Sequence, residues 1–196
     1  MKPILFIDWD GTLCFDRFWR SSNQKIVEHI QEFLFTQNNT MVNDWMKGKF
    51  SSEEINRLVA DEIGIGYEEL FQIFIQDCET MKVQPKIFEK IAALRERFTT
   101  VLMTDNMDCF SRFTSPALQL NRYFDRVVNS SAEKRLKREY NGKSFKDIAD
   151  MFGSDIRKSI LIDDSEETCR LFESLGGQSM QVNSPKDTSF HLDSIR

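Results

Sequence analysis

Two aspartates stand one position apart near the start of the chain. Residues 8–12 read Asp-Trp-Asp-Gly-Thr and directly follow the short apolar run Ile4-Leu5-Phe6-Ile7. One carboxylate can attack phosphorus and form an acyl phosphate, while a second can serve as a general acid and then as a general base. We therefore expect Asp8 to be a nucleophile and Asp10 to protonate a leaving oxygen and later activate water. Gly11 permits a tight turn out of the strand.

Hydroxyl and carboxylate side chains also follow two later apolar runs. They are Thr104 and Asp105 after residues 101–103, and Asp163 and Asp164 after residues 160–162. Because ligands of open parallel sheets bind at the carboxyl ends of the strands, we expect all of these side chains to gather at one edge. Crowded carboxylates raise one another's pKa, and a hard divalent cation removes this conflict. Mg²⁺ prefers oxygen ligands and commonly keeps a substrate phosphate, so the pattern predicts a Mg²⁺ and oxyanion site.

The elements that would position these residues alternate between strands and helices. The apolar runs cover residues 4–7, 101–103, 126–129 and 160–162, with a fifth candidate at 179–182. Pro85 suits the start of a helix, and Gly153 and Gly176 suit the ends of two others. This alternation predicts an α/β fold with a doubly wound, Rossmann-like parallel sheet. The tail from about Asn183 is polar, and we expect it to be loosely held.

Residues 15–84 depart from this alternation, because they show helical patterns and no convincing strand. Ser51 and Glu54 form a capping-box pattern ahead of one such helix. We therefore expect a small α-helical cap at residues 15–84, inserted into a catalytic α/β core that residues 1–14 and 85–196 form.

The segment at residues 8–12 is similar to the first signature of the haloacid dehalogenase superfamily, a large family dominated by phosphatases. Further signatures follow in the family's order. Thr104 resembles the hydroxyl residue that ends the second strand and holds phosphate, and the pair Asp163-Asp164 resembles the acidic pair that holds magnesium. The resemblance covers nearly the whole chain, since residues 15–84 resemble the family's small helical cap.

This resemblance implies a phosphatase mechanism. Asp8 would attack, Asp10 would act as acid and then base, and Thr104 and one lysine would hold the phosphoryl oxygens. Mg²⁺ would be held by Asp8, the Asp10 carbonyl and Asp164, with Asp163 beside it in the acidic pair. The substrate would be a small phosphorylated metabolite, because family members that act on macromolecules usually lack a cap.

The chain departs from the family pattern in two places. It has no Lys-Pro at the expected lysine position; Lys143 fits by its distance to Ile148, and Lys146-Asp147-Ile148 looks like a Lys-Asp-Leu form of other branches, so Lys146 is slightly preferred. Asp105 stands where the family often has asparagine, and it either points away from the phosphate or touches the substrate. The basic run at residues 133–139 is interpreted as a solvated segment, with a phosphate-gathering edge as the alternative.

Composition limits the classes of partner. The 196-residue chain is 40% hydrophobic and has a net charge of −5, which gives no support for binding to nucleic acid or to an acidic membrane. The four cysteines form no CxxC pair, so we expect free thiols and no structural zinc. No signal-peptide pattern and no apolar run of roughly 18 residues is present. We expect a cytoplasmic protein and leave its oligomeric state open.

Other functions compatible with the same residues are weighed against the phosphatase. A dehalogenase of this family would lack the second aspartate, so Asp10 argues against it. A phosphotransferase or phosphomutase would use the same residues and differ only in whether water reaches the intermediate. A non-catalytic, phosphate-binding regulatory module is disfavoured because Asp8 and Asp10 are both intact. The main prediction is Mg²⁺-dependent hydrolysis of a small phosphomonoester through an aspartyl phosphate, with a substrate that the fold does not specify.

Overall fold

The computed structural model of the chain describes residues 1–195 and is built on a five-stranded parallel sheet with the order β3-β2-β1-β4-β5. The strands are β1 (Ile4–Ile7), β2 (Thr99–Thr104), β3 (Arg126–Asn129), β4 (Ile160–Asp163) and β5 (Gln178–Gln181). The first strand lies in the middle, where Phe6 pairs with Val101 of β2 and with Leu161 of β4. The predicted α/β fold with a parallel sheet is confirmed.

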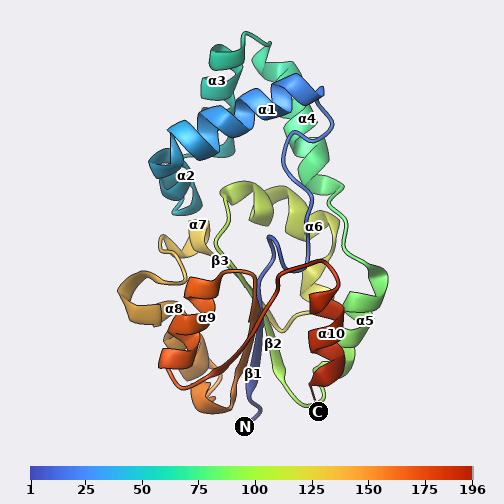
Figure 1. Ribbon diagram of the computed structural model, residues 1–196, viewed down its shortest axis with the longest axis vertical. Coiled ribbons are helices and arrows are strands. Elements are labelled where there is room, and N and C mark those ends of the chain that lie inside the picture. Colours follow the sequence, from blue (N-terminus) through green and yellow to red (C-terminus); the bar gives the residue numbers. More distant parts are fainter. Residues whose placement is uncertain (196) are drawn as a thin grey trace.

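Helices cover both faces of the sheet (Figure 1). One face carries α8 (Glu139–Met151) and α9 (Glu166–Ser174), and the other carries α5 (Pro85–Leu94) and α10 (Asp187–Ser194). Successive side chains of β1 enter the two cores in turn: Phe6 packs against Phe145 and Phe172, with ring centroids 5.2 and 5.6 Å away, whereas Leu5 and Ile7 join the core on the other face. A strand buried on both faces explains why its sequence is wholly apolar.

The helices between β1 and α5 form a layer of their own above the carboxyl ends of the strands (Figure 1). They are α1 (Gln24–Gln31), the π-helical segment η1 (Glu32–Gln37), α2 (Asn39–Met46), α3 (Ser52–Ile63) and α4 (Tyr67–Glu79). We call residues 15–84 the cap. Its interior is aromatic: Trp19, Trp45 and Phe74 are fully buried, and the rings of Trp19 and Phe74 lie 4.9 Å apart. The Ser51–Glu54 capping box is present at the start of α3.

The remaining elements are short. They are η2 (Phe110–Thr114), α6 (Ser115–Ala117), η3 (Leu120–Arg122), α7 (Ser130–Glu133) and η4 (Ile156–Lys158). The expectation of a loosely held tail is wrong for the described residues, because α10 packs on α5. Thr188 is buried and donates from Oγ1 to the carbonyl of Thr12 at 2.6 Å, and Leu192 is buried as well. None of the described helices combines the length and the apolar character needed to cross a bilayer.

Candidate active site

The site forms at the carboxyl ends of the three central strands. Asp8 immediately follows β1, Thr104 ends β2 and Asp163 ends β4. Because β1 lies between β2 and β4, these ends are neighbours. Asp8, Asp163 and Asp164 each offer a carboxylate oxygen, and the three oxygens lie within 4.8 Å of one another. The structure thus brings the acidic residues at the ends of β1 and β4 together, as the sequence predicts.

The turn after β1 sets Asp10 beside this cluster. Gly11 has a φ of +69°, and a Cβ placed on it would lie 2.4 Å from Oδ2 of Asp164, so only glycine fits here without displacing that carboxylate. Asp10 accepts a hydrogen bond at Oδ2 from Nδ2 of Asn106 at 3.3 Å. Burial raises the pKa of Asp10 to about 6, although the charge of Arg17 opposes the shift. A carboxyl group with this pKa can both donate and accept a proton near neutral pH.

Lys137 is the cation of the site. Its ammonium group lies 2.6 Å from Oδ2 of Asp163 and 3.0 Å from Oδ1 of Asp8, and only 4% of the residue is exposed. Burial alone would lower the pKa of Lys137, but the carboxylates of Asp163 and Asp8 outweigh it and raise the pKa. The lysine therefore keeps its charge inside the protein. Burial raises the pKa of Asp8, which the charge of Lys137 opposes.

Neither lysine suggested by the sequence reaches this cluster, which is a correction to the predicted site. Lys143 is half-exposed and donates to Oδ1 of Asp147 at 2.7 Å, and Lys146 is exposed on the outer face of α8. The reason is helical geometry. Ile148 is buried against the sheet, and at about 100° per residue Lys146 and Lys143 lie roughly 200° and 140° around the helix from it.

Lys137 reaches the site from the segment before this helix. That segment ends in a left-handed turn at residues 140–142, where Tyr140, Asn141 and Gly142 have φ values of 52°, 57° and 69°. Two of these residues are not glycine, so the periodicity of the following helix cannot be extended back to Lys137. The one sequence signal was the basic run at residues 133–139, of which a single lysine turns inward.

Asp105 positions this lysine. Its Oδ1 accepts a hydrogen bond from the backbone N–H of Lys137 at 2.8 Å. Burial raises the pKa of Asp105, and the charge of Lys137 opposes the shift. Of the two roles left open by the sequence, the contact favours the one in which Asp105 is directed at the protein and not at a substrate.

Two buried oxygen atoms at the strand ends have hydrogen-bonding capacity that the described residues leave unfilled. Oδ1 of Asp8, apart from its ion pair with Lys137, and Oγ1 of Thr104 have no hydrogen-bond partner within residues 1–195. Buried polar atoms are normally satisfied, so these two oxygens indicate a place for a ligand. An all-oxygen set with Asp8 and Asp164 is also the kind of donor set that suits Mg²⁺.

The two aspartates at the end of β4 differ in whether their carboxylate oxygens are free to bind a metal ion. Asp163 accepts at Oδ2 from Lys137 and at Oδ1 from the backbone N–H of Ser165 at 2.9 Å. Asp164 is exposed as a residue, but partial desolvation of its carboxylate and the charge of Asp163 raise its pKa. Asp8 and Asp164 are therefore the carboxylates best placed to hold Mg²⁺, while Asp163 holds the lysine. The role of the Asp10 carbonyl as a ligand stays a prediction.

The loop after β2 ties the cap to the site. Asp108 accepts hydrogen bonds from Nε1 of Trp45 at 2.9 Å, from Oγ of Ser52 at 2.7 Å and from Arg112 at 2.8 Å. Burial would raise the pKa of Asp108, but these hydrogen bonds lower it below its ordinary value. A charged, well-bonded carboxylate thus joins α2 and α3 of the cap to the strand end that carries Thr104.

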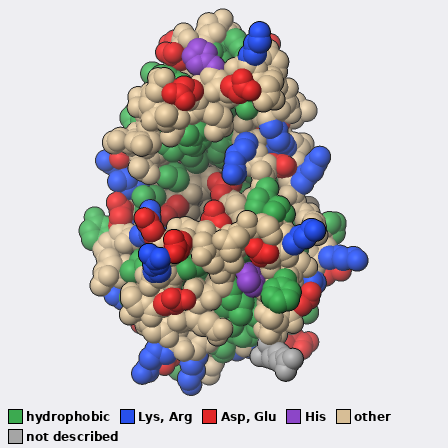
Figure 2. All heavy atoms as spheres, in the orientation of Figure 1, with side chains coloured by type: hydrophobic (Ala, Val, Ile, Leu, Met, Phe, Trp, Pro, Cys, Tyr) green, Lys and Arg blue, Asp and Glu red, His purple; other side chains and the backbone are tan. Residues whose placement is uncertain are grey.

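A cavity of about 300 Å³ opens between the cap and the strand ends. Figure 2 shows it as a hollow with hydrophobic side chains on the cap side and acidic side chains near its floor. Its lining consists of Asp10, Asp16, Arg17, Phe18, Gln31, Phe35 and Met107. The cavity therefore reaches Asp10 directly, and its walls come from the start of the cap, from α1 and η1, and from the loop after β2.

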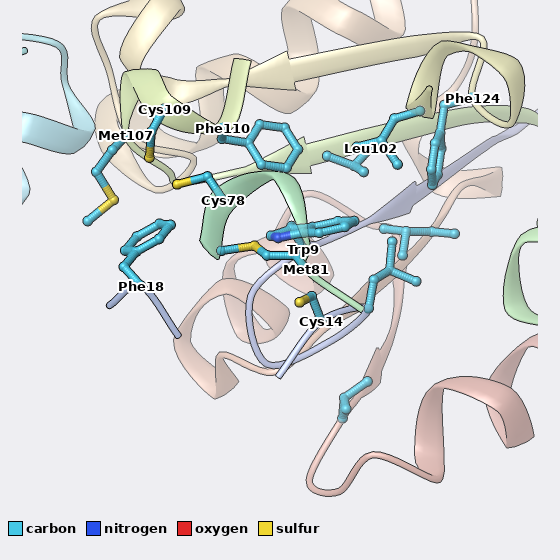
Figure 3. Close-up of a cluster of buried hydrophobic side chains, with 14 of the residues drawn as sticks. Trp9, Cys14, Phe18, Cys78, Met81, Leu102, Met107, Cys109, Phe110 and Phe124 are labelled. Atoms are coloured by element: carbon cyan, nitrogen blue, oxygen red, sulfur yellow. The ribbon is translucent and has the colours of Figure 1, made fainter. Parts of the chain in front are cut away.

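The protein beneath the cavity is rich in sulfur and aromatic side chains (Figure 3). Trp9 is fully buried there, with its ring centroid 5.4 Å from that of Phe110. Cys14, Cys78 and Cys109 belong to the same cluster, and all four cysteines of the chain are buried and free. This packing holds the turn between Asp8 and Asp10 from below.

Comparisons with known proteins bear on the fold. No protein-family model and no curated protein matches the chain. Among solved structures, a HAD family enzyme from Bacteroides thetaiotaomicron in complex with magnesium and inorganic phosphate is similar with a TM-score of 0.71 at 17% identity, over 94% of this chain and 96% of that one. A predicted HAD-like family hydrolase from Porphyromonas gingivalis gives 0.71 at 20% identity, over 97% and 98%.

Dehalogenases share the same architecture. The L-2-haloacid dehalogenase from Xanthobacter autotrophicus, with chloropropionic acid covalently bound, has a TM-score of 0.59 at 12% identity, over 100% of this chain and 84% of that one. These identities are too low to carry over an activity. They do cover the sheet and the cap together, and the chain therefore has the fold of the haloacid dehalogenase (HAD) family enzymes.

Proposed function

We propose that this protein is a Mg²⁺-dependent phosphatase that hydrolyses a small phosphorylated metabolite in the cytoplasm through an aspartyl phosphate (an acyl phosphate) on Asp8. The observation that carries the proposal is the buried Asp8 oxygen, which lies 3.0 Å from the Lys137 ammonium group and has no other partner among the described residues. A nucleophilic oxygen, a buried cation and an acid with a raised pKa meet there beneath a cap.

Each residue has one task in the first half of the reaction. The Asp8 carboxylate attacks phosphorus and forms the new P–O bond, while the bond from phosphorus to the leaving oxygen breaks. Burial raises the pKa of Asp10 to about 6, so a fraction of the molecules carries the protonated acid near neutral pH, and in that form Asp10 gives its proton to the leaving oxygen. Lys137 and the unpaired hydroxyl of Thr104 balance the charge on the phosphoryl oxygens.

The second half reverses these roles. Asp10, now a carboxylate, takes a proton from a water molecule. The water oxygen attacks phosphorus, the bond from phosphorus to the Asp8 oxygen breaks, and free phosphate and the Asp8 carboxylate result. Bound Mg²⁺ would neutralise negative charge at the reacting phosphoryl group. Asp8 and Asp164 would hold it. The presence of magnesium and inorganic phosphate in the complex of the Bacteroides neighbour is in keeping with the proposed metal and the proposed product.

The dehalogenase alternative rests on fold similarity alone. Displacement of a halide requires a carboxylate nucleophile but no proton donor for the leaving group, whereas Asp10 is set beside Asp8 with a raised pKa. The phosphotransferase alternative differs only in the acceptor. Adding an alcohol acceptor to the phosphatase assay separates it, because transfer would yield a new ester in place of free phosphate.

Rapid-quench labelling with 4-nitrophenyl [³²P]phosphate and Mg²⁺ tests the proposal. Asp10→Asn keeps the nucleophile, so it should accumulate labelled protein with this good leaving group, while general acid–base loss slows turnover roughly 10²–10⁴-fold. Asp8→Asn should carry no label. Asp150→Asn, a change at an exposed position on α8, serves as the matched control and should behave like the unaltered protein.

Two results would count against the proposal. Equal labelling of Asp8→Asn and the unaltered protein would show that Asp8 is not the nucleophile. Failure of both the unaltered protein and Asp10→Asn to label or to release phosphate from any phosphate ester would favour the non-catalytic, phosphate-binding alternative.

A further inference from the structure

The cavity beside Asp10 has walls of two kinds. Its apolar wall, which we define as Phe18, Phe35 and Met107, is accompanied by the polar and charged lining residues Asp10, Asp16, Arg17 and Gln31. Its volume of about 300 Å³ is at the lower end of the range of roughly 300–1,000 Å³ that small-molecule sites occupy. The space therefore suits a compact organic group and not a macromolecule.

Phe35 is exposed for a local reason. It lies in the π-helical segment η1, where its neighbour Leu34 is fully buried in the cap while Phe35 itself remains 38% exposed and lines the cavity. Such π-helical turns are rare and occur often at functional sites. The cap thus presents an aromatic ring to the cavity that it could otherwise have buried in its own core.

Arg17 forms no close ion pair among the described residues, although the carboxylates of Asp10 and Asp164 lie near enough for its charge to lower their pKa values. Arg20, one turn further on, lies 3.7 Å from Asp16 and 3.6 Å from Asp77 and donates to Thr80. The Arg17 side chain makes no ion pair or hydrogen bond to any residue from 1 to 195. It lies on the cavity wall, and its charge lowers the pKa of Asp10.

The position of the cavity identifies which part of a substrate it would take. Asp10 lines it, whereas Asp8, Thr104 and Lys137, which would hold the phosphoryl group, do not. Asp10 is the residue that would protonate the leaving oxygen. What extends into the cavity is therefore the leaving group and not the phosphate itself.

We infer that the leaving group of the substrate has a compact apolar body, which packs on the apolar wall, and a second anionic group, which pairs with Arg17. This inference rests on the proposed function, because it places the ester oxygen at Asp10. A carboxylate and a second phosphate share the required chemistry, since each accepts two parallel N–H bonds from a guanidinium group. Sugar phosphates and simple alkyl phosphates that carry no second anionic group would offer Arg17 no charged partner.

The test separates binding from turnover by the use of phosphonates, which cannot be hydrolysed. Titration calorimetry with Mg²⁺ compares 4-carboxybenzylphosphonate with 4-carbamoylbenzylphosphonate, two ligands of nearly the same shape that differ by one charge. The unaltered protein should bind the carboxylate about five- to tenfold more tightly. Arg17→Gln should abolish this preference, and Arg17→Lys should keep part of it.

Two control variants separate the charge effect from the packing effect. Lys25→Gln removes a cation from an exposed position on α1 outside the lining of the cavity, so it should leave the preference unchanged. Phe35→Ala should weaken both phosphonates by a similar factor and preserve their ratio, because it removes apolar contact and no charge.

The outcomes distinguish this inference from the proposed function. Equal binding of the two phosphonates, or a preference that survives in Arg17→Gln, overturns the inference. If 4-carboxyphenyl phosphate and 4-nitrophenyl phosphate are not hydrolysed while the binding preference is present, the proposed phosphatase function is wrong and the anion site at Arg17 is supported. If hydrolysis occurs without the preference, the reaction stands and the anion site is wrong. Absence of any phosphonate binding overturns both.

Discussion

The most informative single change is Lys137→Met, because it removes the one buried cation of the site and preserves most of the side-chain volume. Lys137 contacts Asp163 at 2.6 Å and Asp8 at 3.0 Å, and its loss leaves two buried carboxylates without a counter-charge. We expect both stability and activity to fall. Lys143→Met and Lys146→Met, which change exposed lysines on α8, are the matched controls.

The magnitude follows from these two contacts. With an effective dielectric constant of about 20, each contact gives a Coulomb attraction of ~6 kcal/mol. Desolvation of the charges offsets much of this attraction, so removing one partner of such a buried pair costs about 3–5 kcal/mol. Loss of an electrostatic donor from an active site lowers kcat by roughly 10²–10³-fold. The control variants should change stability by less than about 0.5 kcal/mol.

Urea denaturation followed by tryptophan fluorescence measures the stability of all three variants, with and without Mg²⁺. Hydrolysis of 4-nitrophenyl phosphate measures kcat. Mg²⁺ should stabilise Lys137→Met more than the unaltered protein, because a bound cation relieves the repulsion between the carboxylates. The reasoning fails if Lys137→Met unfolds at the same urea concentration as the controls, or if Lys143→Met or Lys146→Met loses activity to the same degree.

Three further changes probe the turn, the cap contact and the metal. Gly11→Ala should lower Mg²⁺ affinity and activity at least about tenfold, because its Cβ would lie 2.4 Å from Asp164. Gly66→Ala, which has open space around it, is the control and should have nearly unchanged activity. Titration of the activity with Mg²⁺ compares the two variants. Asp108→Asn should cost about 1–3 kcal/mol at pH 7. The folded-state pKa of Asp108 lies below its ordinary value of 3.8, so the stabilisation is fully present above pH 3.8 and disappears as the pH falls through the folded-state pKa. Urea denaturation at pH 7 and at pH 3 measures this loss. A chelator should abolish phosphate release and Ca²⁺ should restore it poorly; full activity of metal-free protein would contradict this.

The sheet and the acidic cluster follow from local sequence because their determinants are local. A short apolar run such as residues 4–7 can be stable only when both of its faces are covered, and in an α/β order this places the next polar residue at the carboxyl edge. Asp8 and Asp163 could therefore be placed from sequence. Parallel pairing then brings them together whatever the details of the intervening helices.

Lys137 could not be placed in this way, because its position depends on backbone geometry that periodicity does not contain. Three successive left-handed residues separate it from the regular part of α8, and two of them, Tyr140 and Asn141, adopt a conformation that their side chains disfavour. The surrounding run of basic residues is typical of a solvated surface. The carboxylates of Asp8 and Asp163, which come from distant parts of the chain, bind the ammonium group of this one lysine, and Asp105 holds its backbone N–H.

The helical tail was hidden by its composition. Helix α10 is mostly polar, and its packing depends on a few positions such as Thr188 and Leu192, which are spaced by one helical turn. The hydroxyl of Thr188 donates to the carbonyl of Thr12, in the turn after β1. Thr188 and Thr12 are far apart in the sequence, so a local sequence pattern cannot reveal their contact.

Every second residue from the end of β2 into the following loop contributes to a different part of the site. Thr104 ends the strand with a buried hydroxyl that has no partner within the described chain, Asn106 donates to the Asp10 carboxylate at 3.3 Å, and Asp108 accepts from the cap residues Trp45 and Ser52. Five residues thus connect the proposed phosphate contact, the proposed acid and the cap. Because the orientation of Asp10 depends on Asn106, and the course of this loop depends on Asp108, docking of the cap and placement of the acid are parts of one arrangement.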